Sequence, residues 1–203
     1  MTHPAFEEVL APTQYYDRNF QIEAAKILPG EYYVTGRDML LVTVLGSCVA
    51  ACIRDPKTGI GGMNHFMLPE GGDGPHNLLS ASARYGGYAM EVLVNQLLKM
   101  GANRNRLEAK VFGGAAVLRG FTTVTVGEDN SEFVLEYLHN ERIPIVSQDL
   151  RGLYPRKVFF FPASGRVLVK SLRSVHNNTI IEREKEYGSR IKSAEMAGDV
   201  ELF

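Results

Sequence analysis

The chain has no excess of charge and no block of basic residues. Its 22 Lys and Arg nearly balance 23 Asp and Glu, which gives a formal net charge of −1. A protein that binds the phosphate backbone of nucleic acid needs a basic patch, so the sequence argues against a nucleic-acid partner. No Gly-x-Gly-x-x-Gly or P-loop pattern follows an expected strand, which leaves a nucleotide-binding function without support.

Long apolar runs are also missing. No run approaches the ~20 residues that span a membrane, and the first eight residues lack the basic and apolar regions of a signal peptide. We therefore expect a cytoplasmic protein without membrane insertion, in which the only two cysteines, Cys48 and Cys52, are reduced. At 203 residues, 45% of them hydrophobic, the chain is long enough for one domain with a proper core.

Most of the predicted elements are strands. Runs rich in β-branched, aromatic and other apolar residues predict strands at 31–35, 39–45, 48–54, 60–68, 109–112, 122–126, 143–146 (an edge strand), 157–161 and 167–172. Helical spacing predicts helices at 20–28, at 82–100, from a capping box at 129–132 through 139, and weakly at 180–197. Residues 69–75, rich in Gly and Pro, predict a surface loop.

The balance of these elements indicates the fold class. Because strands outnumber helices and many connections favour antiparallel pairing, we expect an α+β layered domain rather than a doubly wound parallel sheet. We divide the chain into an N-terminal extension at 1–28, a main domain at 29–175 and a charged C-terminal tail at 176–203.

Cys48 follows a predicted bend. An apolar strand runs into Gly46 and Ser47, and the cysteine comes directly after them. Such a bend can lift the thiol out of a sheet and aim backbone N–H groups at a developing oxyanion. A thiol with a pKa near ~8.5 is a poor nucleophile at neutral pH, so it needs a base beside it. The blander interpretation is a buried apolar residue, the common environment of a free cysteine.

His65 lies in the second apolar run, which begins at Gly61 and Gly62. Residues 55–59 have the chemistry of a hairpin loop, so the two runs are expected to be antiparallel neighbours that bring thiol and imidazole together. A lone histidine on an apolar strand is usually a hydrogen-bonded core residue, but paired glycines permit close approach of a substrate. The pair favours a Cys–His amide hydrolase.

A third residue is needed to orient the histidine. Thr43, Ser47 and Asn64 are the candidates close in sequence, although Asn64 would point away from His65 on a regular strand. Farther along, Gly113 and Gly114 end a predicted strand and form either a turn or a site where a substrate backbone approaches closely.

A zinc site is the less favoured alternative. It would use Cys48, Cys52, His65 and His76. Closed zinc sites usually place their cysteines on a knuckle rather than within a β-branched strand, so we expect no metal. Cys52 lies four positions after Cys48, too far along a strand for a disulfide, and we interpret it as a structural residue.

Three strings resemble one known family. They are LGSCV at 45–49, GGMNHFMLP at 61–69 and KVFGGA at 110–115, and they are similar to those of the chemoreceptor glutamine deamidases, the CheD family. PGEYY at 29–33 and RKVFF at 156–160 are similar as well, so the resemblance spans roughly residues 29–173.

The resemblance implies a site and a reaction. Cys48 would be the nucleophile, His65 the base and Thr43 the third member, with substrate contacts expected at Gly46, Ser47, Gly113 and Gly114. The implied substrates are selected glutamine side chains of methyl-accepting chemotaxis receptors, hydrolysed to glutamate through a thioester with release of ammonia and without a cofactor. The implied fold is a three-layer α/β/β sandwich similar to cysteine-dependent deamidating toxins.

Two other functions stay open at this point. The first is a non-catalytic chemotaxis adaptor that binds receptors or the CheC phosphatase, which some family members bind. The second is a thiol amidase or transglutaminase-like enzyme that acts on other amides. Residues 70–76 are a further expectation, as a loop that clamps a helical protein substrate.

Overall fold

The computed structural model describes residues 9–69, 81–116, 124–173 and 178–196. Within these ranges the chain forms eleven strands, three α-helices and a short 3-10 helix, η2 (Arg104–Arg106). The strands are β1 (Val9–Leu10), β2 (Thr13–Asp17), β3 (Ile22–Lys26), β4 (Glu31–Thr35), β5 (Leu40–Leu45), β6 (Val49–Arg54), β7 (Gly61–His65), β8 (Glu108–Gly113), β9 (Ile145–Leu150), β10 (Arg156–Phe161) and β11 (Arg166–Ser171). The helices are α1 (Ala81–Lys99), α2 (Val124–Asn140) and α3 (Asn178–Met196).

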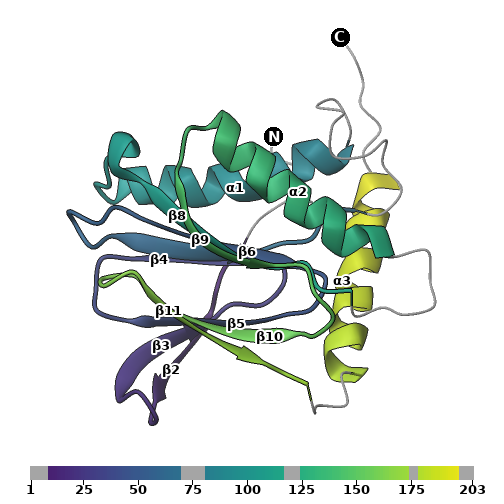
Figure 1. Ribbon diagram of the computed structural model, residues 1–203, viewed down its shortest axis with the longest axis horizontal. Coiled ribbons are helices and arrows are strands. Elements are labelled where there is room, and N and C mark those ends of the chain that lie inside the picture. Colours follow the sequence, from purple (N-terminus) through teal and green to yellow (C-terminus); the bar gives the residue numbers. More distant parts are fainter. Residues whose placement is uncertain (1–8, 70–80, 117–123, 174–177, 197–203) are drawn as a thin grey trace.

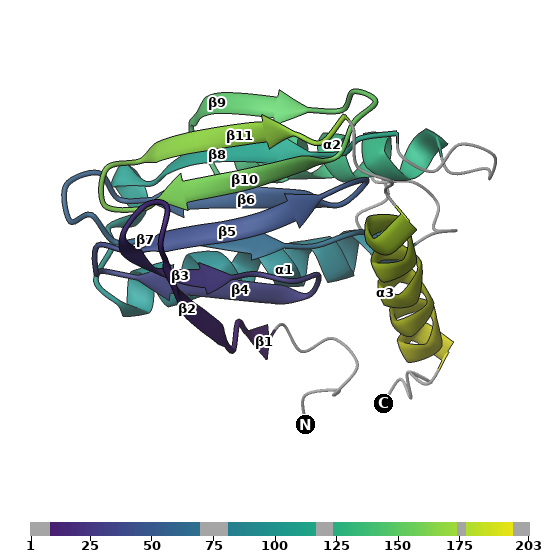
Figure 2. The same cartoon turned by 90° about the horizontal axis from the view of Figure 1, so that it is seen from below.

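The strands form two stacked mixed sheets. The six-stranded sheet has the order β1-β4-β7-β6-β8-β9, and the five-stranded sheet has the order β11-β10-β5-β3-β2. Helices α1 and α2 cover the outer face of the six-stranded sheet, while α3 stands at one end of the sandwich (Figure 1). Seen from below, α3 lies beyond the C-terminal end of β5 and runs across the strand direction (Figure 2). The predicted three-layer α/β/β sandwich is confirmed.

Apolar side chains at helical spacing pack α1 against the main core. Tyr85, Ala89, Leu93 and Leu97 recur at helical spacing, and all four are buried in the main core. The helix ends before Gly101, whose φ of 105° few other residues adopt. None of the helices in the described ranges has the length and apolarity needed to cross a membrane.

The chain changes sheet at residues 46–48. Strand β5 lies in the middle of the five-stranded sheet, β6 lies in the six-stranded sheet, and only three residues join them. Strands β6 and β7 are antiparallel neighbours, with Cys52 opposite Met63 and an isolated bridge between Val49 and Phe66. The predicted hairpin is therefore confirmed.

The helix predicted at residues 20–28 is wrong. Strand β3 occupies Ile22–Lys26, antiparallel to β2 and parallel to β5. Glu, Ala and Lys favour helices in isolation, but pairing with two strands overrides that preference. Ala24 and Ala25 are both fully buried, because β3 is covered on both faces at this point.

The start of the second helix is also different from the prediction. Helix α2 begins at Val124, so residues 129–132 are not a capping box, and residues 124–126 are not part of a strand. Ser131 donates to the carbonyl of Gly127 at 2.6 Å inside the helix, and Asn130 bonds to other elements instead of capping. Residues 122 and 123 lie outside the described residues.

Three other expectations concern an edge strand, a hairpin and a surface loop. The strand expected at 143–146 is β9, at Ile145–Leu150, and it is an edge strand as predicted. Strands β10 and β11 form the predicted hairpin. From residue 70 onward, the expected surface loop lies outside the described residues.

Candidate active site

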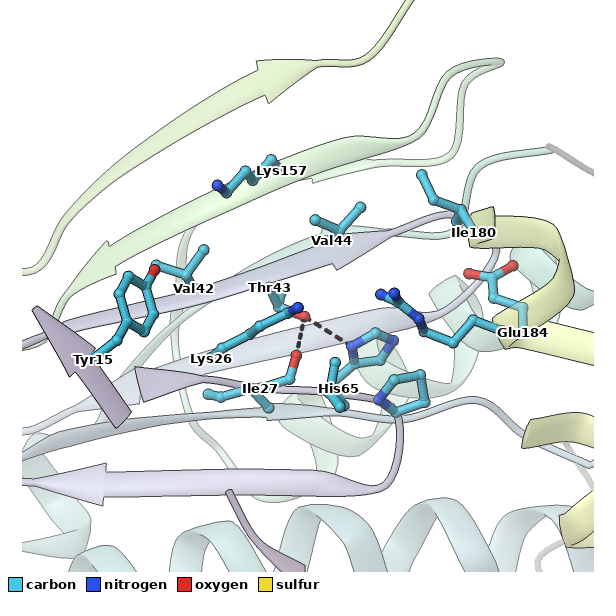
Figure 3. Close-up of a pocket in the computed structure, with 13 residues that line it drawn as sticks. Tyr15, Lys26, Ile27, Val42, Thr43, Val44, His65, Lys157, Ile180 and Glu184 are labelled. Carbon is cyan, nitrogen blue, oxygen red and sulfur yellow. Dashed lines mark hydrogen bonds between the residues drawn. The ribbon is translucent and has the colours of Figure 1, made fainter. Parts of the chain in front are cut away.

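A hydrogen bond between the two sheets orients His65. The residue ends β7, whereas Thr43 lies in β5, and the Thr43 Oγ1 atom is 2.8 Å from His65 Nδ1. The same hydroxyl donates to the carbonyl of Ile27 at 2.8 Å (Figure 3). A hydroxyl has one proton and a carbonyl can only accept, so Thr43 accepts its second bond from the Nδ1–H of His65. The imidazole therefore keeps its lone pair on Nε2.

The environment of His65 favours the neutral ring. Its side chain is only 2% exposed, and its Nε2 atom is buried with no hydrogen-bond partner among the described residues. Burial lowers the pKa of His65 to about 3, and the positive charge of Arg183 also lowers it. A neutral imidazole with a free Nε2 lone pair is the form that accepts a proton from a nucleophile.

Protein groups hold the carbonyl side of the turn at residues 46–48, which we call the Cys48 turn. The N–H of Ala115 donates to the Gly46 carbonyl at 2.8 Å, and the N–H of Gly114 donates to the Cys48 carbonyl at 2.8 Å. The Asn130 side chain donates to the Ser47 carbonyl at 2.9 Å. All three carbonyls are thus bound, which fixes the direction of the N–H groups.

The N–H side of the Cys48 turn holds a carboxylate. Glu184, on α3, accepts from the N–H groups of Gly46 at 2.9 Å, Ser47 at 3.0 Å and Cys48 at 3.2 Å. It also accepts from the Ser47 hydroxyl at 2.7 Å. A Cβ atom on Gly46 would lie 2.7 Å from Glu184 Oε1, so the absence of a side chain there permits this approach. Converging donors of this kind stabilise a negatively charged oxygen.

Cys48 is fully buried beside this carboxylate. Burial raises the pKa of the Cys48 thiol well above its ordinary value, and the negative charge of Glu184 and the hydrogen bond to Glu184 raise it further. The thiol is therefore protonated at neutral pH in this arrangement.

Cys48 and His65 are brought to the same end of the β6/β7 pair. The bridge between Val49 and Phe66 puts Ala50 opposite His65, and Cys48 directly precedes β6. The sulfur forms no hydrogen bond with Nε2 in this arrangement.

A cavity of about 220 Å³ opens beside the histidine. Thr43 and His65 line it from the two sheets, and Ile180, Arg183 and Glu184 line it from α3 (Figure 3). Tyr15, Lys26 and Lys157, which belong to strands of the five-stranded sheet, also line it. The cavity leads to the carboxylate and the imidazole, whereas Cys48 does not line it.

The family comparison covers the motifs at 110–115 and 156–160. The family model described as "CheD chemotactic sensory transduction" matches residues 67–171. The chain belongs to the CheD family.

Relatives of similar length extend this CheD match over the whole chain. A protein of Thiobacillus denitrificans named "Probable chemoreceptor glutamine deamidase CheD" is 65% identical over 199 residues, 98% of each chain. A protein of Methylobacillus flagellatus with the same name is 61% identical over 204 residues, the full length of both. A solved structure, Bacillus licheniformis "hypothetical protein YfiH", is similar with a TM-score of 0.39 and 14% identity, covering 70% of this chain and 62% of that chain.

Gly113 and Gly114 support the turn in this CheD chain. Their φ angles are 115° and 69°, and a Cβ atom on Gly113 would lie 2.1 Å from the Cys48 carbonyl oxygen. Glycine is therefore needed for the end of β8 to approach the Cys48 turn. A contact of these two glycines with substrate stays a prediction.

The other candidates considered in the sequence have different partners. Asn64 points away from His65 as expected: it accepts from the Ala51 N–H at 2.9 Å and donates to the Ala89 carbonyl at 3.2 Å. Cys52 is buried, which raises its pKa. Among the described residues, no group of three or more His, Cys, Asp or Glu could hold a metal ion, and His76 lies outside them.

Sequence reasoning missed Glu184 and Asn130. Asn130 was interpreted as part of a helix cap, and nothing local distinguishes it. Glu184 did carry a signal, because it is an acid at helical spacing between Ile180, Tyr187 and Ile191, on the buried face of α3. A single carboxylate in an otherwise apolar stripe needs a partner.

Proposed function

We propose that the chain hydrolyses the side-chain amide of selected glutamines on chemotaxis receptors to glutamate, with release of ammonia. The names of the CheD relatives support the reaction and the class of substrate. One observation carries the proposal: the N–H groups of the Cys48 turn hold the carboxylate of a glutamate directly beside a thiol. That carboxylate is the group which glutamine deamidation produces.

In the proposed mechanism Cys48 is the nucleophile and His65 moves the protons. His65 Nε2 takes the thiol proton, and the sulfur attacks the carboxamide carbon to form a tetrahedral oxyanion held by the turn N–H groups. The protonated imidazole returns its proton to the nitrogen, the C–N bond breaks, and ammonia leaves a thioester. A water molecule, deprotonated by His65, attacks the thioester and releases glutamate and the thiol.

Thr43 positions the base in this proposal. Its hydroxyl accepts the Nδ1–H of His65 and is itself tied to the Ile27 carbonyl. Both the tautomer and the ring plane are thereby set from the other sheet. Gly46 and Ser47 supply donors to the carboxamide oxygen, whereas residues 70–76, proposed as a substrate clamp, lie outside the described residues. A cytoplasmic location is part of the same proposal.

A receptor fragment provides the direct test. Incubation with the purified full chain should add about 1 Da for each glutamine converted, because an amide is replaced by an acid. The Cys48→Ala variant should add no mass, whereas Cys52→Ala, which removes the other buried cysteine, should keep activity. An unchanged fragment mass with the native chain would contradict the proposed reaction.

A second candidate function is an adaptor that binds receptors or a CheC-type phosphatase without turnover. Two observations favour the adaptor function: Cys48 is fully buried, and Glu184 already accepts hydrogen bonds from the N–H groups of the Cys48 turn. It predicts co-purification of the receptor fragment with no change in mass. Addition of a primary amine tests the transglutaminase-like alternative, since transamidation would add the mass of that amine instead.

A further inference from the structure

Glu184 has no role in the proposed reaction, yet it is the most closely held group at the site. It is 4% exposed and comes from α3, 136 residues after Cys48 in the chain. Each of its oxygens takes two hydrogen bonds. Oε1 accepts from the N–H groups of Gly46 and Cys48, and Oε2 accepts from the N–H and hydroxyl of Ser47.

We propose that α3 is a built-in product mimic, in which Glu184 occupies the position of the converted side chain on the Cys48 turn and shuts the site until α3 is displaced. This inference rests on the proposed function, because it takes the turn as the site where the amide is cleaved. The partner that displaces α3 is a substrate segment, which presents glutamine where α3 presents glutamate.

The chemistry of the contact supports this assignment. A glutamate side chain has the same carbon skeleton as glutamine and differs only in one oxygen that replaces the nitrogen. The donors on the turn fit the oxygens of the product, and Gly46 leaves space for them. Because the mimic is presented from an α-helix, the inferred substrate glutamine also lies on a helix that docks across the end of the sandwich (Figure 2).

The way α3 is attached is consistent with displacement. Tyr187 packs against Gly30, where a Cβ atom would lie 2.9 Å from its ring, and its hydroxyl is hydrogen-bonded to that of Tyr85. Ile191 is buried one turn farther along. None of the four donors to Glu184 carries a full positive charge, and a buried carboxylate without a cation is a weak source of stability.

Occupation by Glu184 keeps the site inactive in two ways. Its carboxylate accepts the hydrogen bonds of the N–H groups that would otherwise stabilise the oxyanion. It also raises the pKa of the Cys48 thiol, which His65 would have to deprotonate, through its negative charge and a hydrogen bond. The Nε2 atom of His65 is left without a partner among the described residues. Removal of α3 frees the N–H groups and takes a negative charge away from the sulfur, which lowers the barrier to forming the thiolate.

The first test measures thiol reactivity and needs no receptor. In the full-length Glu184→Ala variant, iodoacetamide should alkylate Cys48 about tenfold faster or more than in the native chain, because the carboxylate no longer holds the turn. Because Cys48 and Cys52 lie on the same tryptic peptide, the variants are compared in a Cys52→Ala background, where Cys48 is the only cysteine left. The matched control is Glu182→Ala, which removes an exposed acid from the same helix and should leave the rate unchanged. Equal rates in Glu184→Ala and native protein overturn the inference.

The second test uses the Glu184→Gln variant, which turns the mimic of the product into a mimic of the substrate. The site should hydrolyse this amide within its own chain, so the peptide that contains residue 184 gains about 1 Da as its amide becomes an acid. The double variant Glu184→Gln/Cys48→Ala should keep the amide. A stable amide at residue 184 in a chain that converts the receptor fragment overturns the inference.

The two tests separate this inference from the function on which it rests. Faster alkylation in Glu184→Ala without any conversion of a receptor fragment would mean that α3 shields the thiol and that the proposed reaction is wrong. Conversion of the receptor fragment with equal alkylation rates would leave the reaction standing and refute the role of α3.

Discussion

Among the carboxylates that are buried in the described part of the chain, Asp55 and Glu184 are held in different ways. Asp55, in the loop between β6 and β7, receives two hydrogen bonds from the Arg106 guanidinium, at 2.9 and 2.6 Å. It also accepts from the N–H groups of Lys57 and Asn103. Glu184 receives four hydrogen bonds as well, but all of them come from uncharged groups on the Cys48 turn.

The difference separates a structural carboxylate from a functional one. The hydrogen bonds from Arg106, with those from the two N–H groups, hold the pKa of Asp55 well below its usual range. Asp55 thus joins the β6/β7 loop to the segment before β8. Glu184 joins a helix at the end of the sandwich to a thiol and has no cation among its donors, which suits a contact that has to be released.

Removal of each carboxylate should have a different effect on thermal stability. Asp55→Ala leaves Arg106 and two N–H groups without their acceptor, so we expect the Tm to fall by roughly 5 °C or more. Glu184→Ala should lower the Tm by roughly 2 °C or less, since α3 can leave and water can reach the turn. Thermal unfolding followed by circular dichroism measures both, and equal losses would make α3 an integral part of the fold.

Thr43→Val tests whether the buried polar groups at the site serve the chemistry rather than stability. Valine has nearly the same shape but cannot accept the Nδ1–H of His65, so the imidazole loses its fixed tautomer. We expect kcat for the receptor fragment to fall roughly tenfold or more with little change in KM. Thr43→Ser, which keeps the hydroxyl, should restore most of the rate. A change in KM alone would assign Thr43 to substrate binding.

The buried, neutral His65 should make the stability of the protein depend on pH. The folded-state pKa of His65 is about 3, below its ordinary value of 6.5, so the unfolded chain binds a proton between these values and the folded chain does not. The free energy of unfolding should therefore be level above pH 6.5 and fall by up to roughly 1.4 kcal/mol per pH unit below it.

Denaturant unfolding between pH 4.5 and 6.5 measures this slope. The contribution of Asp55 begins to be lost only below pH 3.8, the ordinary pKa at which the carboxyl of the unfolded chain takes up a proton. The window from pH 4.5 to 6.5 therefore reports on the histidine. His65→Gln should flatten the dependence. A native slope equal to that of the variant would mean that His65 is accessible to protons in the folded state.

Local patterns in the sequence predicted the parts of the site that lie on short segments. The bend at Gly46 and Ser47, the hairpin that carries His65, and the β10/β11 pair all depend on neighbouring residues, and the structure places each as expected. Strand β3 was missed because its helix-favouring residues are held by β2 and β5, and pairing between distant segments leaves no local trace.

The hydrogen-bond partners of the Cys48 turn also come from distant segments, so local sequence patterns did not predict them. Ser47 bonds to Glu184 and, through its carbonyl, to Asn130, residues 137 and 83 positions away. Neither pairing follows from the periodicity of its own helix. The acid in the apolar stripe of α3 indicates that a buried partner exists, but only the packed fold identifies which turn supplies it.

The short crossing at residues 46–48 has a wider consequence. Because Thr43 belongs to one sheet and His65 to the other, the alignment of the proposed base depends on how the two layers sit against each other. A side chain in the interior between the layers, such as Leu41 or Met63, can thus disturb proton transfer without touching any reacting atom. Enlarging or trimming such residues would reduce turnover by misaligning the imidazole, even in a chain that still folds.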